Sequence, residues 1–392
     1  MKPWITVWIL MAAVAAAPRV DAARDNTEKK EQERAEQERK EEEKKDRERR
    51  EQEKRDQQKR ARDKKEPDKK EPKKNGDDAA TEAAEKPVDD LYPILEGGKV
   101  GYIDRSGKKV IDAAFEDGAD FAETRARVKW QGRFGYIGTD GRLAIPARYD
   151  AAGDFSEGLA RVQGRDRQGK VSEGYIDING KPVVFLPFEE TARFNDGRAR
   201  VKLGGKYGFI DDTGTLVIPA KYDAAGDFRE GLAAVQLGSQ WGYVDLGGGE
   251  AIPPRYERAS AFSEGAAAVR IGEKWGFVDR NGKQLIDPSL ELVHDFSEGL
   301  AVAAVKGKRG FLNKKGRWEI KPQYDLAGGF SGGLAWVKIG DRVGFIDTKG
   351  RVVIEAKYDR AADFYKGLAR VHVGGRMGYL DRQGKWVWEP RD

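Results

Sequence analysis

The chain has 392 residues, enough for one large repeat array or for two to three ordinary domains. It contains no cysteine, which excludes disulfides, thiolate zinc sites and a cysteine nucleophile. Its only histidines are His294 and His372, so multi-histidine metal centres are excluded as well. The formal charge of +5 is concentrated near the N-terminus, where residues 24–75 carry 22 basic and 18 acidic side chains, whereas the two kinds are equal from residue 76 onward. The basic balance therefore predicts no nucleic-acid partner.

Residues 1–22 have the features of an export signal peptide. Lys2 precedes an apolar run that ends at Ala17, and residues 20–22 fit the small-x-small rule for signal cleavage. The apolar run is shorter than the ~20 residues that span a bilayer comfortably. We therefore expect an exported protein, periplasmic or extracellular, without a transmembrane helix after cleavage; an uncleaved membrane anchor is the alternative.

Residues 24–66 form a highly charged segment that has no means of building a core. Its aliphatic side chains are two alanines, so it also lacks the heptad seam of a coiled coil. Acidic residues repeatedly precede basic ones by four positions, which favours an isolated helix. The pattern predicts a charged single helix that acts as a stalk, with disorder as the alternative. Residues 67–90, rich in Pro, Gly and Ala, predict a flexible linker.

From residue 91 to the C-terminus, one motif is repeated nine times. At its centre is a glycine followed by an aromatic residue, and successive glycines are 34 residues apart except for one step of 39: Gly101, Gly135, Gly174, Gly208, Gly242, Gly276, Gly310, Gly344 and Gly378. A second column keeps the same spacing with the same single step of 39: Phe121, Phe155, Phe194, Phe228, Phe262, Phe296, Phe330 and Phe364. Two registers that agree independently predict a repeat array over 91–392, with a loop insertion near 165–169.

The repeats are expected to be all-β. A period of 34 residues also occurs in helical tetratricopeptide arrays, but several glycines in each unit would break any helix longer than two turns. The short segments between the glycines are β-branched and aromatic, which predicts a β-meander of three strands per unit. Nine units exceed the usual four to eight blades of a propeller. An open, superhelical, solenoid-like array is therefore the preferred architecture, and a closed propeller-like ring is the alternative.

Three segments of the repeats carry a family resemblance. The sequence Trp-Gly-Tyr-Val-Asp at 241–245, its counterpart at 274–279 and the block 222–233 resemble the bacterial WG (KWG) repeat family. Tryptophan precedes the central glycine only at 241 and 275, so a role specific to that tryptophan is not implied. The resemblance implies a β-rich repeat module, often exported, with no settled enzymatic activity.

The polar positions that recur at the turns are expected to be structural. An aspartate follows the central strand in seven units, as Asp104 and Asp279 do, and lies directly before a Gly-containing turn. One carboxylate per turn is too few for a calcium loop and suits the capping of turn amides. The glycine-lysine pair at 107–108 lacks the spacing and the following helix of a phosphate loop. Neither a metal site, a cofactor nor a catalytic residue is therefore predicted.

The aromatic columns are expected to form the core. The loop phenylalanines and a tyrosine column, represented by Tyr149 and Tyr222, recur too regularly for a ligand box and are assigned to packing within and between units. Trp130 shares parity with Val128 and is assigned to the core together with the residues aligned with it: Leu203, Leu237 and Ile271.

One column varies in chemical character, and it supplies the candidate ligand surface. It lies six residues after each loop phenylalanine and, by strand alternation, faces away from a neighbouring buried valine column. Arginine and tryptophan are typical of interface hot spots and suit anionic or glycan ligands; ordinary solvent-exposed decoration is the alternative. The candidate ligand-surface residues are Arg127, Arg161, Arg200, Trp336 and Arg370.

The function expected from these features is non-catalytic. A repeat array offers a long surface without an active site, so we expect an exported binding or scaffolding protein with a protein or glycan partner in the cell envelope. An envelope-remodelling hydrolase with surface carboxylates and a purely structural spacer are the alternatives. The sequence does not specify the oligomeric state.

Overall fold

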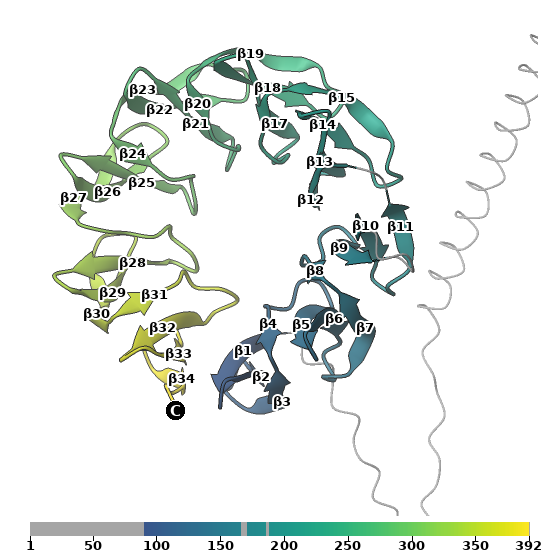
Figure 1. Cartoon of the computed structure of the whole chain (residues 1–392). Helices are drawn as coiled ribbons and strands as arrows, with labels where there is room; N and C mark the ends of the chain where they lie inside the picture. The colour runs from purple at the N-terminus through teal and green to yellow at the C-terminus, as the bar shows by residue number, and fades with distance from the viewer. Residues whose placement is uncertain (1–89, 166–170, 186–187, 392) are drawn as a thin grey trace, which may run out of the picture. The chain divides into compact units, whose positions relative to one another are not determined.

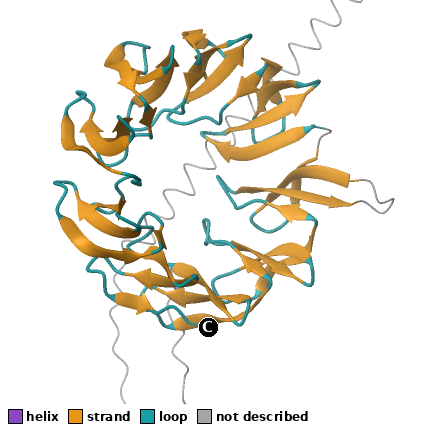
Figure 2. Cartoon of the chain, turned by 60° about the vertical axis from the view of Figure 1, so that its left-hand side comes forward, coloured by secondary structure: helices purple, strands orange, loops and turns teal. Residues whose placement is uncertain are grey.

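The computed structural model describes residues 90–165, 171–185 and 188–391. The expected signal peptide and stalk, and the linker up to residue 89, lie outside the described residues. The described part consists of strands and connecting turns, and it contains no helix with the length and hydropathy needed to span a bilayer (Figure 2). The prediction of an all-β repeat array is confirmed.

The strands form nine antiparallel sheets, each built from strands that are consecutive in the chain. The first sheet has three strands: β1 (Leu91–Glu96), β2 (Lys99–Asp104) and β3 (Lys109–Phe115). The second has four: β4 (Asp117–Gly118), β5 (Ala126–Trp130), β6 (Arg133–Ile137) and β7 (Leu143–Tyr149). The third contains β8 (Ala151–Ala152), β9 (Leu159–Arg165), β10 (Val171–Asp177) and β11 (Pro182–Phe185).

The next three sheets repeat the four-stranded pattern. The fourth contains β12 (Glu190–Asn195), β13 (Arg198–Leu203), β14 (Lys206–Ile210) and β15 (Leu216–Tyr222). The fifth contains β16 (Ala224–Ala225), β17 (Leu232–Leu237), β18 (Gln240–Asp245) and β19 (Glu250–Tyr256). The sixth contains β20 (Arg258–Ala259), β21 (Ala266–Ile271), β22 (Lys274–Asp279) and β23 (Gln284–Leu290).

The last three sheets complete the repeat. The seventh contains β24 (Leu292–Val293), β25 (Leu300–Val305), β26 (Lys308–Asn313) and β27 (Trp318–Tyr324). The eighth contains β28 (Leu334–Ile339), β29 (Arg342–Asp347) and β30 (Val352–Tyr358), with a single bridge between Ala327 and Val337 in place of the short strand. The ninth contains β31 (Arg360–Ala361), β32 (Ala369–Val373), β33 (Arg376–Leu380) and β34 (Trp386–Trp388).

The nine sheets are the blades of a closed ring (Figure 1), and the preferred open array is therefore wrong. The first blade lies beside the ninth, and the Tyr379 hydroxyl donates a 2.9 Å hydrogen bond to the backbone carbonyl of Pro93 across this junction. Similar aromatic contacts recur between neighbouring blades along the array. Closure into a ring depends on how all nine blades pack together, which the sequence period alone does not specify. We call the junction between the ninth and first blades the seam.

Most blades have four strands, not the three expected from the sequence. The additional strand is the innermost one, and in all but the fourth blade it has only two residues, as Ala224–Ala225 does. Ala224 pairs with Gln236 and Ala225 with Val235, at the end of the first long strand. A two-residue strand is too short for any alternation of polar and apolar residues to appear, so the sequence contained no pattern from which to identify it.

The expected role of the turn aspartates is confirmed. The Asp279 carboxylate accepts hydrogen bonds from the backbone N–H groups of Asn281 and Lys283, both at 2.9 Å. Gly282 between them has a φ of 75°, a conformation that glycine adopts without strain. Asn313 replaces aspartate in the seventh blade and accepts the equivalent bond from the Lys315 N–H at 2.9 Å.

Aromatic pairs join each blade to the next. The aromatic residue after the central glycine meets the loop phenylalanine of the following blade; Tyr243 and Phe262, for example, have ring centroids 4.8 Å apart, and both are fully buried. The expected core role of the phenylalanine column is thus confirmed, and that of the tyrosine column is confirmed by the burial of Tyr149 and Tyr222. At the seam the register offers no phenylalanine, and the ring of Tyr92 occupies that place 5.7 Å from Tyr379. Every other blade has alanine at the position of Tyr92, in the column that includes Ala126.

A second link between blades uses a strained turn. Glu264 has a φ of 51° in a two-residue hairpin, and its carboxylate accepts the Gly299 N–H of the next blade at 3.0 Å. A non-glycine residue with such a φ is disfavoured by about 1–2 kcal/mol, and the bond to the next blade offsets this cost. The same arrangement recurs in most blades, as between Glu123 and Gly158. In the ninth blade the position is Lys366, which forms an ion pair with Asp90 at 3.0 Å.

The assignment of Trp130 and its column to the core is wrong. Trp130 exposes 36% of its surface, and the aligned residues are equally accessible: Leu203, Leu237 and Ile271. These residues end the first long strand of their blades, directly before the tight turn. The Trp130 ring packs edge-to-face against Phe115 of the first blade, with centroids 5.8 Å apart, but this contact covers only part of it. Parity therefore predicted the direction of the side chain correctly and its burial incorrectly.

Candidate functional site

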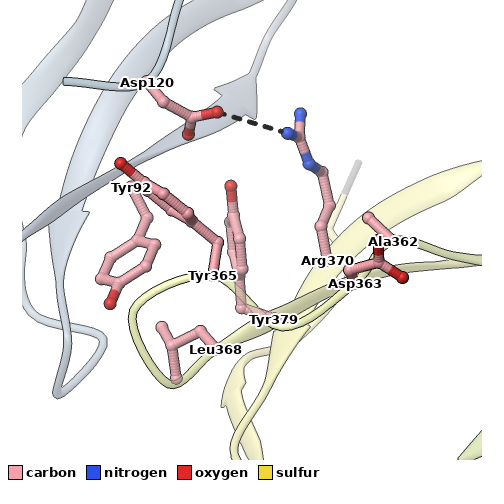
Figure 3. A pocket seen from close by; sticks show the side chains of 8 residues that line it. All are labelled: Tyr92, Asp120, Ala362, Asp363, Tyr365, Leu368, Arg370 and Tyr379. Carbon is pink, nitrogen blue, oxygen red and sulfur yellow. Dashed lines mark ion pairs between the residues drawn. The ribbon is translucent and has the colours of Figure 1, made fainter. Parts of the chain in front are cut away.

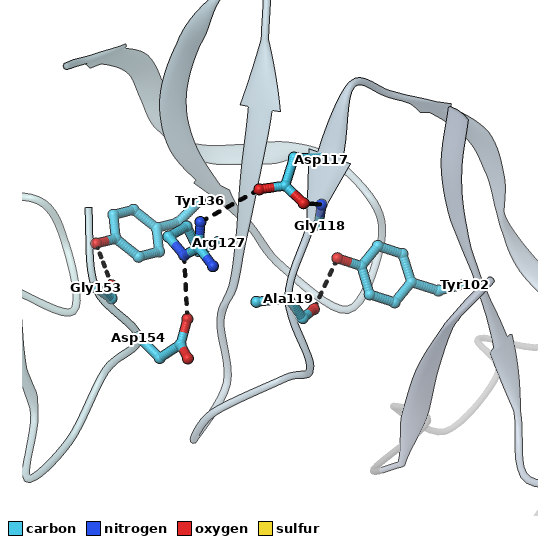
Figure 4. Close-up of polar contacts among 8 residues, drawn as sticks. All are labelled: Tyr102, Asp117, Gly118, Ala119, Arg127, Tyr136, Gly153 and Asp154. Atoms are coloured by element: carbon cyan, nitrogen blue, oxygen red, sulfur yellow. Dashed lines mark hydrogen bonds and ion pairs between the residues drawn. The ribbon is translucent and has the colours of Figure 1, made fainter. Parts of the chain in front are cut away.

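All five residues of the predicted ligand surface are half-buried, and they lie on the first long strand of their blades. Arg127 on β5 lies between two carboxylates, with Asp117 of its own blade at 3.5 Å and Asp154 of the next blade at 3.3 Å (Figure 4). Arg200 on β13 meets Asp227 of the next blade at 3.0 Å. The structure thus places these two arginines in ion pairs that join neighbouring blades.

Arg161 and Trp336 are also engaged by polar partners. The residue before the next loop phenylalanine is Arg193 rather than aspartate, and Arg161 instead pairs with Glu173 at 3.2 Å. The Trp336 side chain donates a hydrogen bond to Asp363 of the ninth blade. Arg161 also donates a 3.2 Å hydrogen bond to the backbone carbonyl of Thr191 in the fourth blade. A ligand role for these residues stays a prediction, but these contacts support a role in holding blades together.

A signal for this pairing was present in the sequence. At four junctions the variable column and the residue before the following phenylalanine match in size or charge: two arginines face aspartates, Ala234 faces Ala261, and Val302 faces Gly329. Two other junctions depart from this rule, with Arg161 opposite Arg193 and Ala268 opposite Asp295. The variable column, considered alone, resembles a solvent-exposed ligand surface. Comparing the two columns would have indicated an inter-blade contact, because complementary pairs at a fixed offset are expected where elements pack together.

We expect Arg200 and Asp227 to be energetically coupled across their junction. Each is partly exposed, so replacing both by alanine should show a coupling energy of about 0.5–1 kcal/mol in a double-mutant cycle of denaturant unfolding. The pair Arg200 and Asp154, which belongs to two different junctions, provides the control and should show additive effects. A coupling energy of zero for Arg200 and Asp227 would contradict the assignment of this pair to blade association.

The fifth residue of the column, Arg370, lies at the seam and lines a pocket there. The repeat period assigns its partner position to Lys86, which lies outside the described residues. Arg370 forms an ion pair with Asp120 of the second blade at 3.7 Å (Figure 3). Asp120 lacks an arginine from the first blade because Pro93 occupies that position of the column. The seam pocket has a volume of about 30 Å³ and is lined by Tyr92, Asp120, Ala362, Asp363, Tyr365, Leu368, Arg370 and Tyr379.

The floor of the seam pocket is apolar and rigid. Tyr92, Leu368 and Tyr379 are each at most 3% exposed and belong to one core cluster shared by the first and ninth blades. The Tyr92 hydroxyl donates a 2.8 Å hydrogen bond to the backbone carbonyl of Lys366. Burial raises the pKa of Tyr92 to about 12, so this hydroxyl is neutral and a donor at physiological pH.

The two carboxylates of the pocket have environments that disfavour their charge. Desolvation raises the pKa of Asp120 above its usual value, although the Arg370 guanidinium opposes this effect. Desolvation also raises the pKa of Asp363, and the hydrogen bond from Trp336 opposes it. Asp363 keeps contact with solvent, but the blades on either side remove enough water to disfavour its ionised form. A positively charged neighbour would stabilise the ionised form of both carboxylates.

The sequence reasoning found Arg370 but missed the pocket around it. The available signal was the set of departures from the repeat in the first and last units. Tyr92 replaces alanine, Pro93 replaces the variable residue, and Tyr365 replaces a serine that elsewhere bonds the next blade, as Ser331 does to the Phe364 carbonyl at 2.6 Å. These positions, which belong to the first and last units, come together only because the ring closes. Among the described residues, no group of three or more potential ligands could hold a metal ion.

Comparison with known proteins supports the repeat assignment. The model of the WG-containing repeat matches eight times, at residues 101–132, 134–163, 174–207, 207–241, 241–275, 275–308, 310–342 and 344–376. No curated protein matches the sequence. A solved eukaryotic initiation factor superposes with a TM-score of 0.56 at 11% identity, over 76% of this chain and 94% of its own, which is a similarity of fold. The dihydro-heme d1 dehydrogenase NirN reaches a TM-score of 0.41 at 14% identity, over 80% and 75% of the two chains.

Proposed function

Because the chain belongs to the WG-containing repeat family, we propose that it is an exported, non-catalytic binding or scaffolding protein whose nine-bladed ring presents a ligand site at the seam. Export rests on the signal-like residues 1–22, and the charged segment 24–66 would hold the ring away from the N-terminus. The partner is a protein or a glycan of the cell envelope.

The observation that carries this proposal is the break in the repeat at the seam. At two internal junctions the polar column residues form pairs, Arg127 with Asp154 and Arg200 with Asp227, and these pairs serve blade association. At the seam, Arg370 of the ninth blade instead reaches to Asp120 of the second blade, and both line an open pocket. A pocket with a rigid apolar floor and a few convergent polar groups is the usual form of a binding site.

A hydrolase is a second candidate, because the same pocket holds two carboxylates. Glycoside hydrolases use two carboxyl groups, one of which has a raised pKa and acts as the general acid. Asp120 and Asp363 both have raised pKa values. If the protein is instead a purely structural spacer, the seam pocket neither binds a ligand nor converts a substrate.

We expect the full-length exported protein to retain a specific envelope partner, and Asp363→Asn with Tyr365→Ala to abolish that retention. Tyr365 is 46% exposed, and asparagine at position 363 keeps an acceptor for the Trp336 hydrogen bond, so their replacement should not disturb the core. The measurement is a pull-down from envelope extract with separate protein and glycan readouts, alongside an assay for hydrolysis of envelope glycans. The matched control is Asp227→Asn, which alters the same column in an internal junction and should leave retention unchanged. Retention that is equal in all variants would exclude the seam, and turnover lost with Asp363→Asn would favour the hydrolase.

A further inference from the structure

We propose that Ala83 and Ala84, which lie outside the described residues, add to the inner edge of β1 as the innermost strand of the first blade. The inference goes beyond the proposed binding function and does not depend on it. It is carried by the open edge of β1, by the register of the repeat before Leu91, and by the ion pair of Asp90. The ring would then begin at Ala83, and the expected linker would be correspondingly shorter.

The first blade presents an edge that the other blades cover. Among the described residues its sheet ends at β1, in the order β1–β2–β3, whereas six other blades begin with a two-residue innermost strand. In the fifth blade, Ala224 of this strand pairs with Gln236. The position equivalent to Gln236 in the first blade is Leu95. The backbone groups of β1 at this edge are suited to pair with one more extended segment.

The chain before β1 keeps the register of the repeat. Counted back from the central glycine, Glu82-Ala83-Ala84 takes the place of Asp223-Ala224-Ala225 in the fifth blade. Leu91 follows Ala83 by eight positions, as Leu232 follows Ala224. The chain therefore has the length needed to form the same hairpin, with no insertion or deletion. An acidic residue followed by two alanines also stands at the start of the third blade, at 150–152.

The ion pair of Asp90 places the start of the first blade in this register. In the internal junctions the hairpin glutamate of one blade bonds a hairpin glycine of the next, as the Glu230 carboxylate accepts the Gly265 N–H at 2.9 Å. Lys366 holds the glutamate position in the ninth blade, and Asp90 holds the glycine position in the first. These two residues form an ion pair at 3.0 Å, so the same two positions meet at the seam. The chain thus enters β1 from the place of the usual hairpin, whose other arm is the innermost strand.

The same register accounts for the pairing of Arg370. It assigns Lys86 to the position that faces Arg370, where two internal junctions have an aspartate. Two cations at these positions would repel each other. Arg370 pairs instead with Asp120 of the second blade, at 3.7 Å.

The carbonyl of Pro93 limits the length of the proposed strand. The equivalent carbonyl in the fifth blade, that of Ala234, accepts the Gly226 N–H at 2.8 Å. At the seam the Tyr379 hydroxyl donates to the Pro93 carbonyl at 2.9 Å. We therefore expect the pairing to end at Ala84, which gives the strand the two residues found in most blades.

The first test is disulfide trapping, because the chain has no cysteine of its own. Ala83→Cys with Leu95→Cys in the full-length protein should form an intramolecular disulfide on mild oxidation, since strand neighbours lie within disulfide range. Leu95 is 54% exposed, so its replacement leaves the core intact. Ala224→Cys with Gln236→Cys is the positive control, and Ala79→Cys with Leu95→Cys should oxidise about tenfold less. Peptide mapping by mass spectrometry identifies each bond.

The second test is hydrogen exchange, which distinguishes a stable strand from a passing contact. The backbone amide of Leu95 should exchange about as slowly as that of Gln236 in the full-length protein. Ala83→Pro with Ala84→Pro removes both N–H groups of the strand and should speed exchange at Leu95 about tenfold, with no change at Gln236.

Two results would overturn the proposal. One is the absence of the bond between positions 83 and 95 under conditions where the positive control oxidises. The other is an amide of Leu95 that exchanges equally fast with and without the two prolines. Neither result bears on retention of a partner by the seam, so this inference can fail while the proposed binding function stands.

Discussion

Tyr92→Ala is expected to lower the free energy of unfolding of the ring by about 3–5 kcal/mol, the usual cost of removing a buried aromatic side chain. Tyr92 is 2% exposed and provides the only aromatic ring of the first blade that meets Tyr379 of the ninth within the described residues. No strand of the described chain crosses the seam, since each sheet consists of consecutive strands. Side chains and loops therefore hold this junction, and the variant should also open the ring. Denaturant unfolding and small-angle X-ray scattering measure the two effects.

Two further variants separate the contributions of Tyr92. Tyr92→Phe keeps the aromatic pair and loses the hydrogen bond to the Lys366 carbonyl, so it should cost about 1 kcal/mol. Phe262→Ala removes an equally buried ring from an internal junction and should destabilise by a similar amount, but the continuous chain on both sides keeps the blades adjacent. An unchanged radius of gyration in Tyr92→Ala would mean that the seam is held by its ion pairs and loops instead.

Gly344→Ala is the second change for which we expect a large loss of stability, about 3 kcal/mol, which is the upper end of the range for overpacked cores. Gly344 is the central glycine of the eighth blade and has no positive φ that would explain its conservation through the repeat by backbone conformation. An added Cβ would lie 2.6 Å from the Ile354 carbonyl oxygen and 2.8 Å from the Ala356 nitrogen. Both are backbone atoms of the outer strand, so neither can move without distorting the sheet.

The matched control for this steric effect is Gly226→Ala. Its added Cβ would come no closer than 3.8 Å to its neighbours, which is ordinary van der Waals contact, and its φ is not positive. It should therefore leave the thermal unfolding midpoint nearly unchanged, while Gly344→Ala lowers it by several degrees. Equal effects of the two substitutions would indicate a general intolerance of side chains at these glycines and contradict the close-approach argument.

The regular spacing of the central glycine is visible in the sequence, but the physical reason why this position must be glycine is not. A spacing of 34 residues is visible in the chain, and so is the strand–turn–strand pattern around it, because both depend on neighbours within one unit. The approach of β29 and β30 that leaves no room for a Cβ at Gly344 depends on a bulge in their pairing, where the register shifts on both sides of Phe345. Such a shift has no signature in a period-2 pattern.

The all-β class, the nine units, the turn role of Asp279 and the buried aromatic columns could be predicted from the sequence, because each follows from local chemistry repeated at a fixed interval. Features that depend on how the blades pack against one another appear only in the folded ring. The tertiary structure closed the array into a ring, exposed Trp130 at the end of its strand, and paired Arg127 and Arg200 with carboxylates of the next blade. It also brought Tyr92 to Tyr379, residues far apart in the chain, and so formed the seam pocket. Closure is a global property, and no single repeat contains the information for it.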